Sequence, residues 1–586
     1  MNEPSSKTVR IGGACGYWGE ADMAWGQLLQ GGTLDYLVFD YLAEISLSIL
    51  ARQRAADPDR GYVPDFVRNL SHHLPDIARR GVKICSNAGG MNVEACAEAV
   101  RAEIRKAGLS LTVSVVTGDD VSGQADQLSG KRDLTSGDVI VAAERTVSAN
   151  AYLGAFPIAH ALNSGADIVI TGRCVDSAVT LGALIHEFGW SDDDLDRLAQ
   201  GSLIGHLLEC GPQVTGGNFT DWETVADGLH DIGYPVAEVA SDGTAVITKP
   251  QGTGGCVTTG TVAEQLLYEI GDPQAYYLPD VICDFSGVMI DDLGQDNVRV
   301  SGAKGRGRPS EYKVSVTIEE GYRLSVLLFM TGRRSRDKAR IVYESALKRG
   351  RRDLADKNWS DYSHTALEIT GDGSPFGEAI DADDIAFRIS VRHEHAPACS
   401  LMLRAILGLG LATPPGLSLF SGGQPRPQPV LRLISILVPK SDVHVRVDGE
   451  AFDSPRPTAL APANAVTPSA PREAADTHVP LERLAFLRSG DKGDTANIGV
   501  IARDPKYLPY IWDALSEDVI RDHFDHCVDG DITCYYLPGP HAMNIVLERA
   551  LGGGGMASLR NDAQGKAYGQ VLARINIPVP RALLFP

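Results

Sequence analysis

Short apolar runs alternate with stretches of helical spacing in the first part of the chain. The runs predict strands at Val9–Gly13, Tyr36–Phe39, Val82–Ser86, Leu111–Thr117 and Ala166–Thr171. Helical spacing follows three of these runs, over Leu42–Arg54, Val93–Lys106 and Ser177–Phe188. Strands that alternate with helices in this way build a mainly parallel sheet with helices on its faces. We therefore expect a large N-terminal α/β domain over residues 8–275.

The pattern changes in the middle of the chain, where apolar runs follow one another with fewer helices between them. Such runs occur at Val281–Met289, Tyr312–Ile318, Tyr322–Met330, Ile385–Val391 and Leu431–Val438. One helix is predicted among them, over Asp337–Lys348. This arrangement favours a more antiparallel α+β part over residues 276–453.

A proline-rich stretch separates this middle part from the C-terminal end. Six prolines occur from Ser454 to Pro480 inclusive, with Ala and Thr among them. Such a composition cannot build a core, so residues 454–479 are predicted to form an extended, mobile linker. Residues 480–586 follow, with elements in the order β, β, α, β, α, β, and this length is enough for a small α+β domain.

Composition and charge exclude some classes of partner. The 586 residues carry a net charge of −21 and no long basic run, which argues against nucleic acid and anionic membranes. The N-terminus is polar, and no apolar stretch approaches the length of a membrane span. The ten cysteines include no Cys-x-x-Cys pair, so we expect neither a zinc knuckle nor a redox dithiol. A cytoplasmic protein with reduced thiols is the simplest interpretation.

Several distinctive loops follow the predicted strands directly: Gly12–Gly19, Ser86–Asn92, Gly118–Asp120 and Gly172–Asp176. Ligands of α/β sheets bind beyond the C-terminal ends of the strands, so these loops together predict one composite pocket. The alternative is that the glycines only make tight turns. Neither a spaced G-x-G-x-x-G after a strand nor a Walker motif occurs, so no nucleotide cofactor is predicted.

Arg173 and Asp176 are the most distinctive charged residues in these loops. Arg173 follows a buried strand and precedes a helix whose N-terminus also attracts anions, so it would suit a carboxylate or phosphate. We therefore predict that both residues bind substrate. An Arg173–Asp176 pair that only fixes the turn is the alternative.

Amides and glycines supply the remaining candidates in the N-terminal domain. We assign substrate binding to Asn87, Asn92, Asn218, Gly89 and Gly90, because amides orient carbonyl groups and glycines let the backbone approach a ligand. Simple turn formation is the alternative for each of them.

One carboxylate stands out in the helix predicted after Phe39. Glu44 lies among apolar residues there, and a buried Glu would have a raised pKa suited to acid–base catalysis. The alternative is that its side chain faces solvent.

Metal and further anion sites have weaker support. The clustered histidines are His393 with His395, and His523 with His526, and neither pair has a specified third ligand. We predict no metal, although the sequence leaves both pairs open. The backbone amides and the lysine of Lys249–Gly255 would suit an anion, without the helix-leading pattern of a phosphate loop. Lys304–Arg308 is a small basic cluster that would suit a phosphate group, and a solvated loop is the alternative.

The most informative segment lies near the C-terminus, at Leu487–Gly499, where two carboxylates, a lysine and an arginine stand close to glycines. Apolar runs flank it, which predicts a strand, a polar loop and a second strand or helix. Asp491, Lys492 and Asp494 are the candidates for proton transfer, and Arg488 and Asn497 for substrate binding. A self-paired charged turn is the alternative.

This segment and others along the chain resemble the AtuA family of acyclic terpene utilisation proteins. The similar segments are Arg10–Gly13 with Gly16–Gly19, Ser86–Asn92, Ser148–Gly154, Ile170–Arg173 with Asp176, Thr215–Trp222, Lys249–Gly255, Leu487–Gly499, and Leu551–Gly555 with Ser558–Arg560. The resemblance implies a ferredoxin-like C-terminal domain and a role in the catabolism of branched acyl-CoA compounds.

The function implied is that of a catabolic enzyme acting on a branched or carboxylated acyl-CoA. Hydration, dehydration or C–C cleavage would need an acid–base pair and an oxyanion holder, but no redox cofactor; coenzyme A would enter as part of the substrate. A homo-oligomer is expected. Two alternatives stay open: a non-catalytic assembly subunit of an acyl-CoA carboxylase pathway, and a hydrolase or ligase acting on another organic acid.

Overall fold

Five parallel strands form the centre of the main sheet in the computed structural model, which describes residues 7–20, 22–137, 139–140, 145–373, 379–419, 423–463, 466 and 468–584. In spatial order they are β1 (Thr8–Gly13), β2 (Tyr36–Phe39), β3 (Lys83–Ser86), β6 (Ile168–Thr171) and β4 (Val113–Thr117). These are the five strands expected from the apolar runs. The predicted parallel core is therefore confirmed.

Antiparallel strands extend this core at both edges into a mixed sheet of eleven strands. On the β1 side lie β7 (Val236–Ala240), β8 (Ala245–Thr248), β12 (Val298–Ser301) and β11 (Met289–Asp292); on the β4 side lie β19 (Arg446–Val447) and β20 (Glu450–Ala451). Strands from both sides of residue 275 thus share one sheet. The run expected at Val281–Met289 divides between β11 and β10 (Ile282–Asp284), which belongs to a small sheet with β9 (Tyr276–Tyr277) and β13 (Lys304–Gly305).

Helices cover both faces of the main sheet, and alternate residues of its strands enter two different cores. In β2, Leu37 and Phe39 join the core with α1 (Met23–Gln30), α3 (Pro64–Arg80) and α4 (Val93–Lys106), whereas Tyr36 and Val38 join the core with α6 (Phe156–Asn163), α7 (Ala178–Phe188) and α8 (Leu195–Leu208). Burial on both faces explains why the apolar run of β2 is continuous. The short helix α5 (Ala125–Leu128) and α9 (Thr259–Leu266) complete this part.

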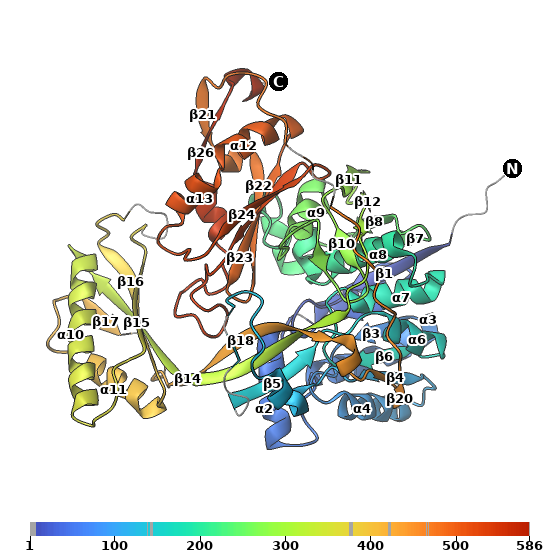
Figure 1. The fold of residues 1–586 in the computed structure, drawn as a ribbon, viewed down its shortest axis with the longest axis horizontal. Helices are drawn as coiled ribbons and strands as arrows, with labels where there is room; N and C mark the ends of the chain where they lie inside the picture. The colour runs from blue at the N-terminus through green and yellow to red at the C-terminus, as the bar shows by residue number, and fades with distance from the viewer. Residues whose placement is uncertain are drawn as a thin grey trace.

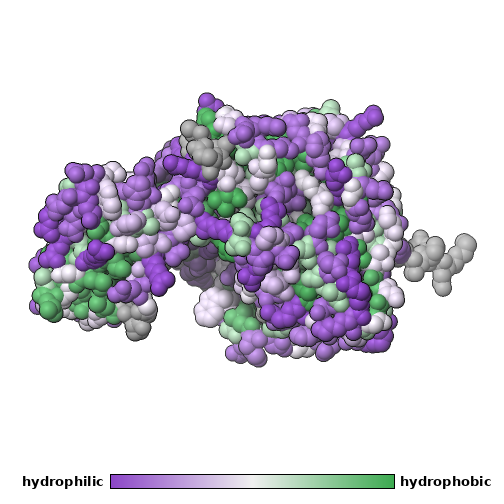
Figure 2. Space-filling model, turned by 90° about the horizontal axis from the view of Figure 1, so that it is seen from below, coloured by the Kyte–Doolittle hydropathy of each residue, from purple (hydrophilic) through white to green (hydrophobic). Residues whose placement is uncertain are grey.

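One strand of 21 residues, β14 (Glu311–Thr331), joins the body to a projecting lobe, as Figure 1 shows. Its first half pairs with β5 (Thr146–Ala151) and β18 (Gln428–Pro439), and its second half with β16 (Asp384–His393) and β17 (Leu417–Leu419). The lobe also contains β15 (His364–Thr370), α10 (Ser335–Ala355) and α11 (Ala396–Leu407). From below, the lobe stands to the left of the body, and hydrophilic residues predominate on the visible surface (Figure 2).

The two strands expected at Tyr312–Ile318 and Tyr322–Met330 are therefore two halves of β14. The pairing with β18 shifts its register between Glu319 and Tyr322, and Gly321 between them has a φ of +82°. A left-handed residue lets the strand continue through this irregularity, and glycine adopts that conformation at little cost.

The C-terminal part is a small α+β unit, as expected. Its antiparallel sheet has the order β22 (Ala485–Lys492), β23 (Thr495–Ala502), β25 (Ala542–Leu547) and β24 (Ile532–Leu537), and β21 (Thr477–Pro480) pairs with β26 (Asn576–Val579). Helices α12 (Leu508–Ala514), α13 (Glu517–His523) and α14 (Tyr568–Leu572) accompany these strands. The charged segment expected as a loop is instead the end of β22, followed by the two-residue turn Gly493–Asp494.

This C-terminal sheet packs firmly on the end of α9. The side chain of Asn497 donates a hydrogen bond to the Leu267 carbonyl at 2.8 Å, and that of Asn544 donates to the Ile270 carbonyl at 2.7 Å. Ile501 of β23 belongs to one of the two cores of the main sheet. The C-terminal part therefore shares buried surface with the body.

The proline-rich segment begins as a docked chain. The backbone of Thr458 donates to the Arg308 carbonyl at 3.0 Å, and the Arg306 side chain donates to the Ala461 carbonyl. Arg308 is 1% exposed and also donates to the carbonyl of Arg456. The cationic segment Lys304–Arg308 thus anchors residues 456–461 here.

Limited digestion with trypsin is expected to cut after Arg472, which is exposed, and to leave Arg456 intact because Pro457 follows it. The fragment 473–586 should stay bound to the rest of the chain, because its sheet is buried against α9. Denaturing gels and mass spectrometry would identify the cut, and gel filtration would test the association. Separation of the two fragments under native conditions would contradict this packing.

Candidate functional site

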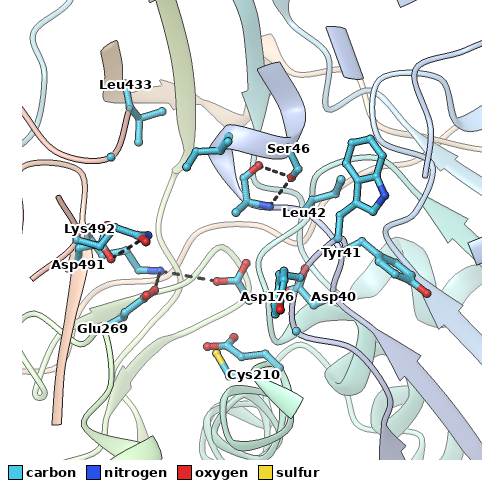
Figure 3. A pocket seen from close by; sticks show the side chains of 18 of the residues that line it. Asp40, Tyr41, Leu42, Ser46, Asp176, Cys210, Glu269, Leu433, Asp491 and Lys492 are labelled. Atoms are coloured by element: carbon cyan, nitrogen blue, oxygen red, sulfur yellow. Dashed lines mark hydrogen bonds and ion pairs between the residues drawn. The ribbon is translucent and has the colours of Figure 1, made fainter. Parts of the chain in front are cut away.

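A cavity of about 720 Å³ lies where three parts of the chain meet. Loops at the C-terminal ends of the parallel strands form one side, β14 and β18 form another, and the β22–β23 turn closes it from the C-terminal part (Figure 3). This volume is typical of small-molecule sites. Of the strand-end loops expected to meet in one pocket, those after β1 and β6 line this cavity, and those after β3 and β4 do not.

Three carboxylates gather at the cavity wall: Asp40 directly after β2, Asp176 in the loop after β6, and Glu209 at the end of α8. One oxygen from each can be chosen such that all three lie within 4.8 Å of one another. Within the described ranges this is the only such cluster that offers three ligand atoms for a metal ion. Carboxylate oxygens suit hard cations, but Arg173 and Lys492 already place positive charge beside Asp176.

Arg173 joins two of these carboxylates and is itself only 3% exposed. Its Nη2 lies 2.6 Å from Asp176 Oδ1, and its Nη1 lies 3.8 Å from Asp40 Oδ1. The guanidinium also stacks over the ring of Tyr152, at 4.1 Å from the centroid. The pair expected to fix the turn is present, and Arg173 also lines the cavity.

The pKa values of the two aspartates move in opposite directions. Burial raises the pKa of Asp40 well above its usual range, and the nearby charge of Asp176 adds to this rise. Burial acts on Asp176 in the same sense, but Arg173 and Lys492 outweigh it and lower the pKa of Asp176 below its usual value. Asn87 holds Asp40 in place, because its amide donates to Asp40 and accepts from the Tyr41 backbone at 2.7 Å.

Glu209 has a buried partner behind it. His206 Nδ1 lies 3.0 Å from Glu209 Oε1, and His206 is 1% exposed. Burial raises the pKa of Glu209; His206 opposes this rise, and the charge of Asp176 adds to it. Asp40 and Glu209 thus hold protons more readily than Asp176 does.

A second group of charges comes from the C-terminal part. Lys492 Nζ lies 2.8 Å from Glu269 Oε2 and 3.9 Å from Asp176 Oδ2, as the dashed lines in Figure 3 show. Lys566 Nζ lies 3.3 Å from Glu269 Oε1 and 3.0 Å from Asp491 Oδ1. Burial would raise the pKa of Glu269, but the two lysines lower it to about 2.

Gly490 makes this contact between β22 and Glu269 possible. A Cβ at position 490 would lie 2.7 Å from Glu269 Cγ, which is too close for any side chain. The glycine therefore lets the strand carry Lys492 into the cavity.

A glycine run forms the neighbouring stretch of wall. Gly553, Gly554 and Gly555 line the cavity with φ between +41° and +97°. Asp494 does not line the cavity; its carboxylate accepts hydrogen bonds from the backbone of Gly553 at 2.8 Å and of Leu551 at 3.0 Å. Asp494 therefore positions the glycine run through these hydrogen bonds. Asp491 and Lys492, in contrast, line the cavity.

The remaining predicted residues are divided between the cavity and the surrounding structure. Asn218 lines the cavity, with a φ of 57°. Arg488 donates to the Asn218 carbonyl at 2.9 Å and stacks over the ring of Tyr268, so it supports the wall from behind. Asn497 lies in the contact with α9 described above. Glu44 begins α2 (Glu44–Ala56), and its side chain is outside the part that the structure describes.

The Ser86–Asn92 loop lies apart from the cavity lining. Asn92 donates to the carbonyls of Pro58 and Arg60, both at 2.8 Å. Gly89 approaches the Thr171 carbonyl, and Gly90 has a φ of +55°. In this loop the geometry matches turn formation, the alternative left open for these residues.

The weaker candidates also have structural partners. Lys249 donates to the Thr253 carbonyl at 2.9 Å and lies 3.3 Å from Asp296 Oδ2. His393 Nδ1 accepts from the His395 backbone at 2.9 Å, and His523 Nε2 lies 3.1 Å from the Val571 carbonyl. In the described part of the chain, neither histidine pair belongs to a cluster of three metal ligands.

Sequence reasoning missed four charged residues of the site: Asp40, Glu209, Glu269 and Lys566. Asp40 had a usable signal, because it directly follows a predicted parallel strand. The other three lie at the end of a helix or in irregular segments, and only the docking of the C-terminal part on α9 brings Glu269 and Lys566 together.

Comparison with known proteins gives a match at the family level. The family model described as "Acyclic terpene utilisation family protein AtuA" matches residues 9–448, and that of the "AtuA ferredoxin-like domain" matches residues 479–578. No curated protein and no solved structure gives a significant match. No helix among the described residues has the length and apolar character needed to cross a membrane.

Proposed function

The chain belongs to the AtuA family, and from this premise we propose that it is an acid–base enzyme acting on a branched or carboxylated acyl-CoA. Membership of the family implies a role in acyclic terpene utilisation. The proposed reaction is hydration, dehydration or C–C cleavage. None of these steps passes electrons to an acceptor, so none needs a redox cofactor.

One observation carries this proposal: Asp40 and Asp176 share a cavity wall and have pKa values displaced in opposite directions. Such a divergence separates a proton donor from a proton acceptor at neutral pH. Asp40, whose pKa is raised, keeps its proton to higher pH and is assigned as the general acid, whereas Asp176, whose pKa is lowered, ionises first and is assigned as the general base. Arg173 keeps Asp176 ionised, and Asn87 orients Asp40.

In dehydration, Asp176 would take the proton from the carbon beside the thioester carbonyl. Asp40 would give its proton to the hydroxyl on the next carbon, the C–O bond would break, and water would leave as the C=C bond forms. Hydration is the reverse of this step. In C–C cleavage the base would take the hydroxyl proton, and the acid would protonate the carbanion that is released.

Lys492 has the position of an electrostatic stabiliser. Its ammonium group lies 3.9 Å from Asp176 and belongs to the cavity lining. Negative charge develops on the thioester oxygen when the neighbouring carbon loses its proton, and a fixed cation stabilises it. The C-terminal part thus supplies the charge that complements the two aspartates.

The test begins with a panel of hydroxylated, unsaturated and carboxylated branched acyl-CoA esters. A true ligand should raise the melting temperature, because binding to the folded state alone stabilises it. Mass spectrometry of the mixture should then show the gain or loss of water, or two fragments. Stabilisation without any conversion would favour the alternative of a non-catalytic subunit. Conversion of another organic acid in place of CoA esters would favour the hydrolase or ligase alternative.

The pH dependence of kcat is expected to be bell-shaped with a broad top. Activity should fall at acidic pH once Asp176 is protonated, which happens below the usual carboxyl range because its pKa is lowered. Activity should fall at higher pH as Asp40 loses its proton, which happens above the usual range because its pKa is raised. A profile without an alkaline limb would contradict the role of Asp40.

A further inference from the structure

Two exposed isoleucines on α2 indicate that one side of the cavity binds an apolar group. Ile45 and Ile49 are 37% and 44% exposed, and both line the cavity. They lie four residues apart and therefore share one face of the helix. Apolar side chains left exposed within a cavity are typical of a surface that receives a ligand.

The opposite wall is also apolar. Leu431 and Leu433 lie two residues apart in β18, so both side chains point from the same face of the sheet. The register pairs Leu433 with Thr317 of β14, and all three residues line the cavity. Leu433 lies across the cavity from Leu42 and Ser46 in Figure 3. Four apolar side chains, together with Ser46, Ser48 and Thr317, thus line the part of the cavity between α2 and β18, and we refer to this part as the channel.

This channel begins beside the carboxylates. Leu42 lines the cavity only two residues after Asp40, and α2 then leads away from it. Ile49 lies about 6 Å further along the helix than Ile45, from the rise of about 1.5 Å per residue. A ligand whose polar end reaches Asp40 and Asp176 would therefore place an aliphatic chain along both isoleucines.

We propose that the channel between α2 and β18 holds the aliphatic chain of the substrate, and that Ile49 and Leu433 limit its length. This inference rests on the proposed function for the identity of the reacting end. The ligand class is an acyl thioester with its chain in the channel and its carbonyl at the aspartates. A second protein is not the intended occupant, because the two apolar walls face each other across a cavity of small-molecule size.

The test uses saturated, methyl-branched acyl-CoA esters of increasing chain length, starting from isovaleryl-CoA. These esters carry no hydroxyl group and no C=C bond, so binding is measured without hydration or dehydration. Calorimetry on the unmodified protein should show affinity rising about fourfold for each added methylene, which corresponds to about 0.8 kcal/mol. The rise should stop at the length that fills the channel.

Ile49→Trp should stop the rise at a shorter chain, and Ile49→Ala should extend it to a longer one. Ile341→Trp is the matched control, because Ile341 is 51% exposed on α10 and does not line the cavity. This control should keep the slope of the unmodified protein. Melting curves would confirm that each variant is folded, and Leu433→Phe repeats the test from the opposite wall.

Two results would overturn the inference: affinity that does not depend on chain length in the unmodified protein, or the same cut-off length in all the Ile49 and Leu433 variants. Either result can occur while the aspartate variants still lose turnover, in which case the proposed function stands without this channel. If the longest chain that still gains affinity changes as expected, but the Asp176 variant keeps full turnover, the channel would be supported as a binding site. The proposed acid–base mechanism would then be wrong.

Discussion

Asp176→Asn is expected to lower kcat by about two to four powers of ten, the usual range for losing a general acid or base. Asparagine keeps the shape of the side chain but cannot accept a proton from carbon. The ligand that stabilises the unmodified protein should still bind, because the apolar walls and Lys492 remain. Steady-state kinetics together with calorimetry would separate loss of turnover from loss of binding.

The same variant has a second expected effect that a structural role would not produce. The charge of Asp176 contributes to the raised pKa of Asp40, so its removal should lower that pKa. The alkaline limb of the residual activity should therefore move to lower pH. Asp196→Asn is the control, because Asp196 pairs with Lys304 outside the cavity. Equal activity of the two variants would rule out Asp176 as the base.

Most of the fold could be predicted from the sequence, because a run of apolar residues indicates directly which residues are buried. The five central strands follow from short runs of buried residues, and α4 follows from buried residues that recur every three or four positions. The same reasoning found Arg173 and Asp176, because residues after parallel strands meet at one edge of the sheet. It applied equally to Asp40, whose position after Phe39 carries the same information.

The C-terminal segment shows what local pattern misses. Its charges suggested a loop, yet residues up to Lys492 pair with β23 in a regular ladder. The turn Gly493–Asp494 is a two-residue signal for a hairpin, so the sequence did contain the evidence for this pairing. Without that pairing, the placement of Lys492 beside Glu269 does not follow. Such contacts depend on how two distant parts of the chain pack together. The spacing of residues within one segment does not predict that packing.

The Ser86–Asn92 loop and the Gly172–Asp176 loop differ in whether they line the cavity. Both directly follow parallel strands, so their positions in the sequence carry the same information. In the structure Asn87 supports Asp40 from behind, whereas Arg173 enters the cavity wall. Arg173 carries a positive charge that pairs with Asp40 and Asp176, whereas Asn87 is a neutral amide that only donates a hydrogen bond to Asp40.

Arg173→Ala is expected to destabilise the fold by about 3–5 kcal/mol, the usual cost of removing one partner of a buried ion pair. Asp40, which is buried, and Asp176, whose side chain is 16% exposed, would then lose the cation that lies near both. Chemical denaturation at neutral pH would measure the loss. Arg52→Ala is the matched control, because Arg52 and its partner Glu319 are 42% and 38% exposed, and it should cost at most about 1 kcal/mol.

The pH dependence of this loss gives the sharper test. Without Arg173 the folded-state pKa of Asp176 should rise above its unfolded value, and the pKa of Asp40, which burial already raises, should rise further, so the folded state would prefer the protonated forms. Their destabilisation is then small at acidic pH and grows as pH rises through the folded-state pKa values. The difference in unfolding free energy between the Arg173→Ala variant and the unmodified protein should accordingly widen from acidic to neutral pH. A loss that is the same at every pH, or as small as that of Arg52→Ala, would mean that Arg173 does not hold Asp176 ionised, and the assignment of Asp176 as the base would lose its physical support.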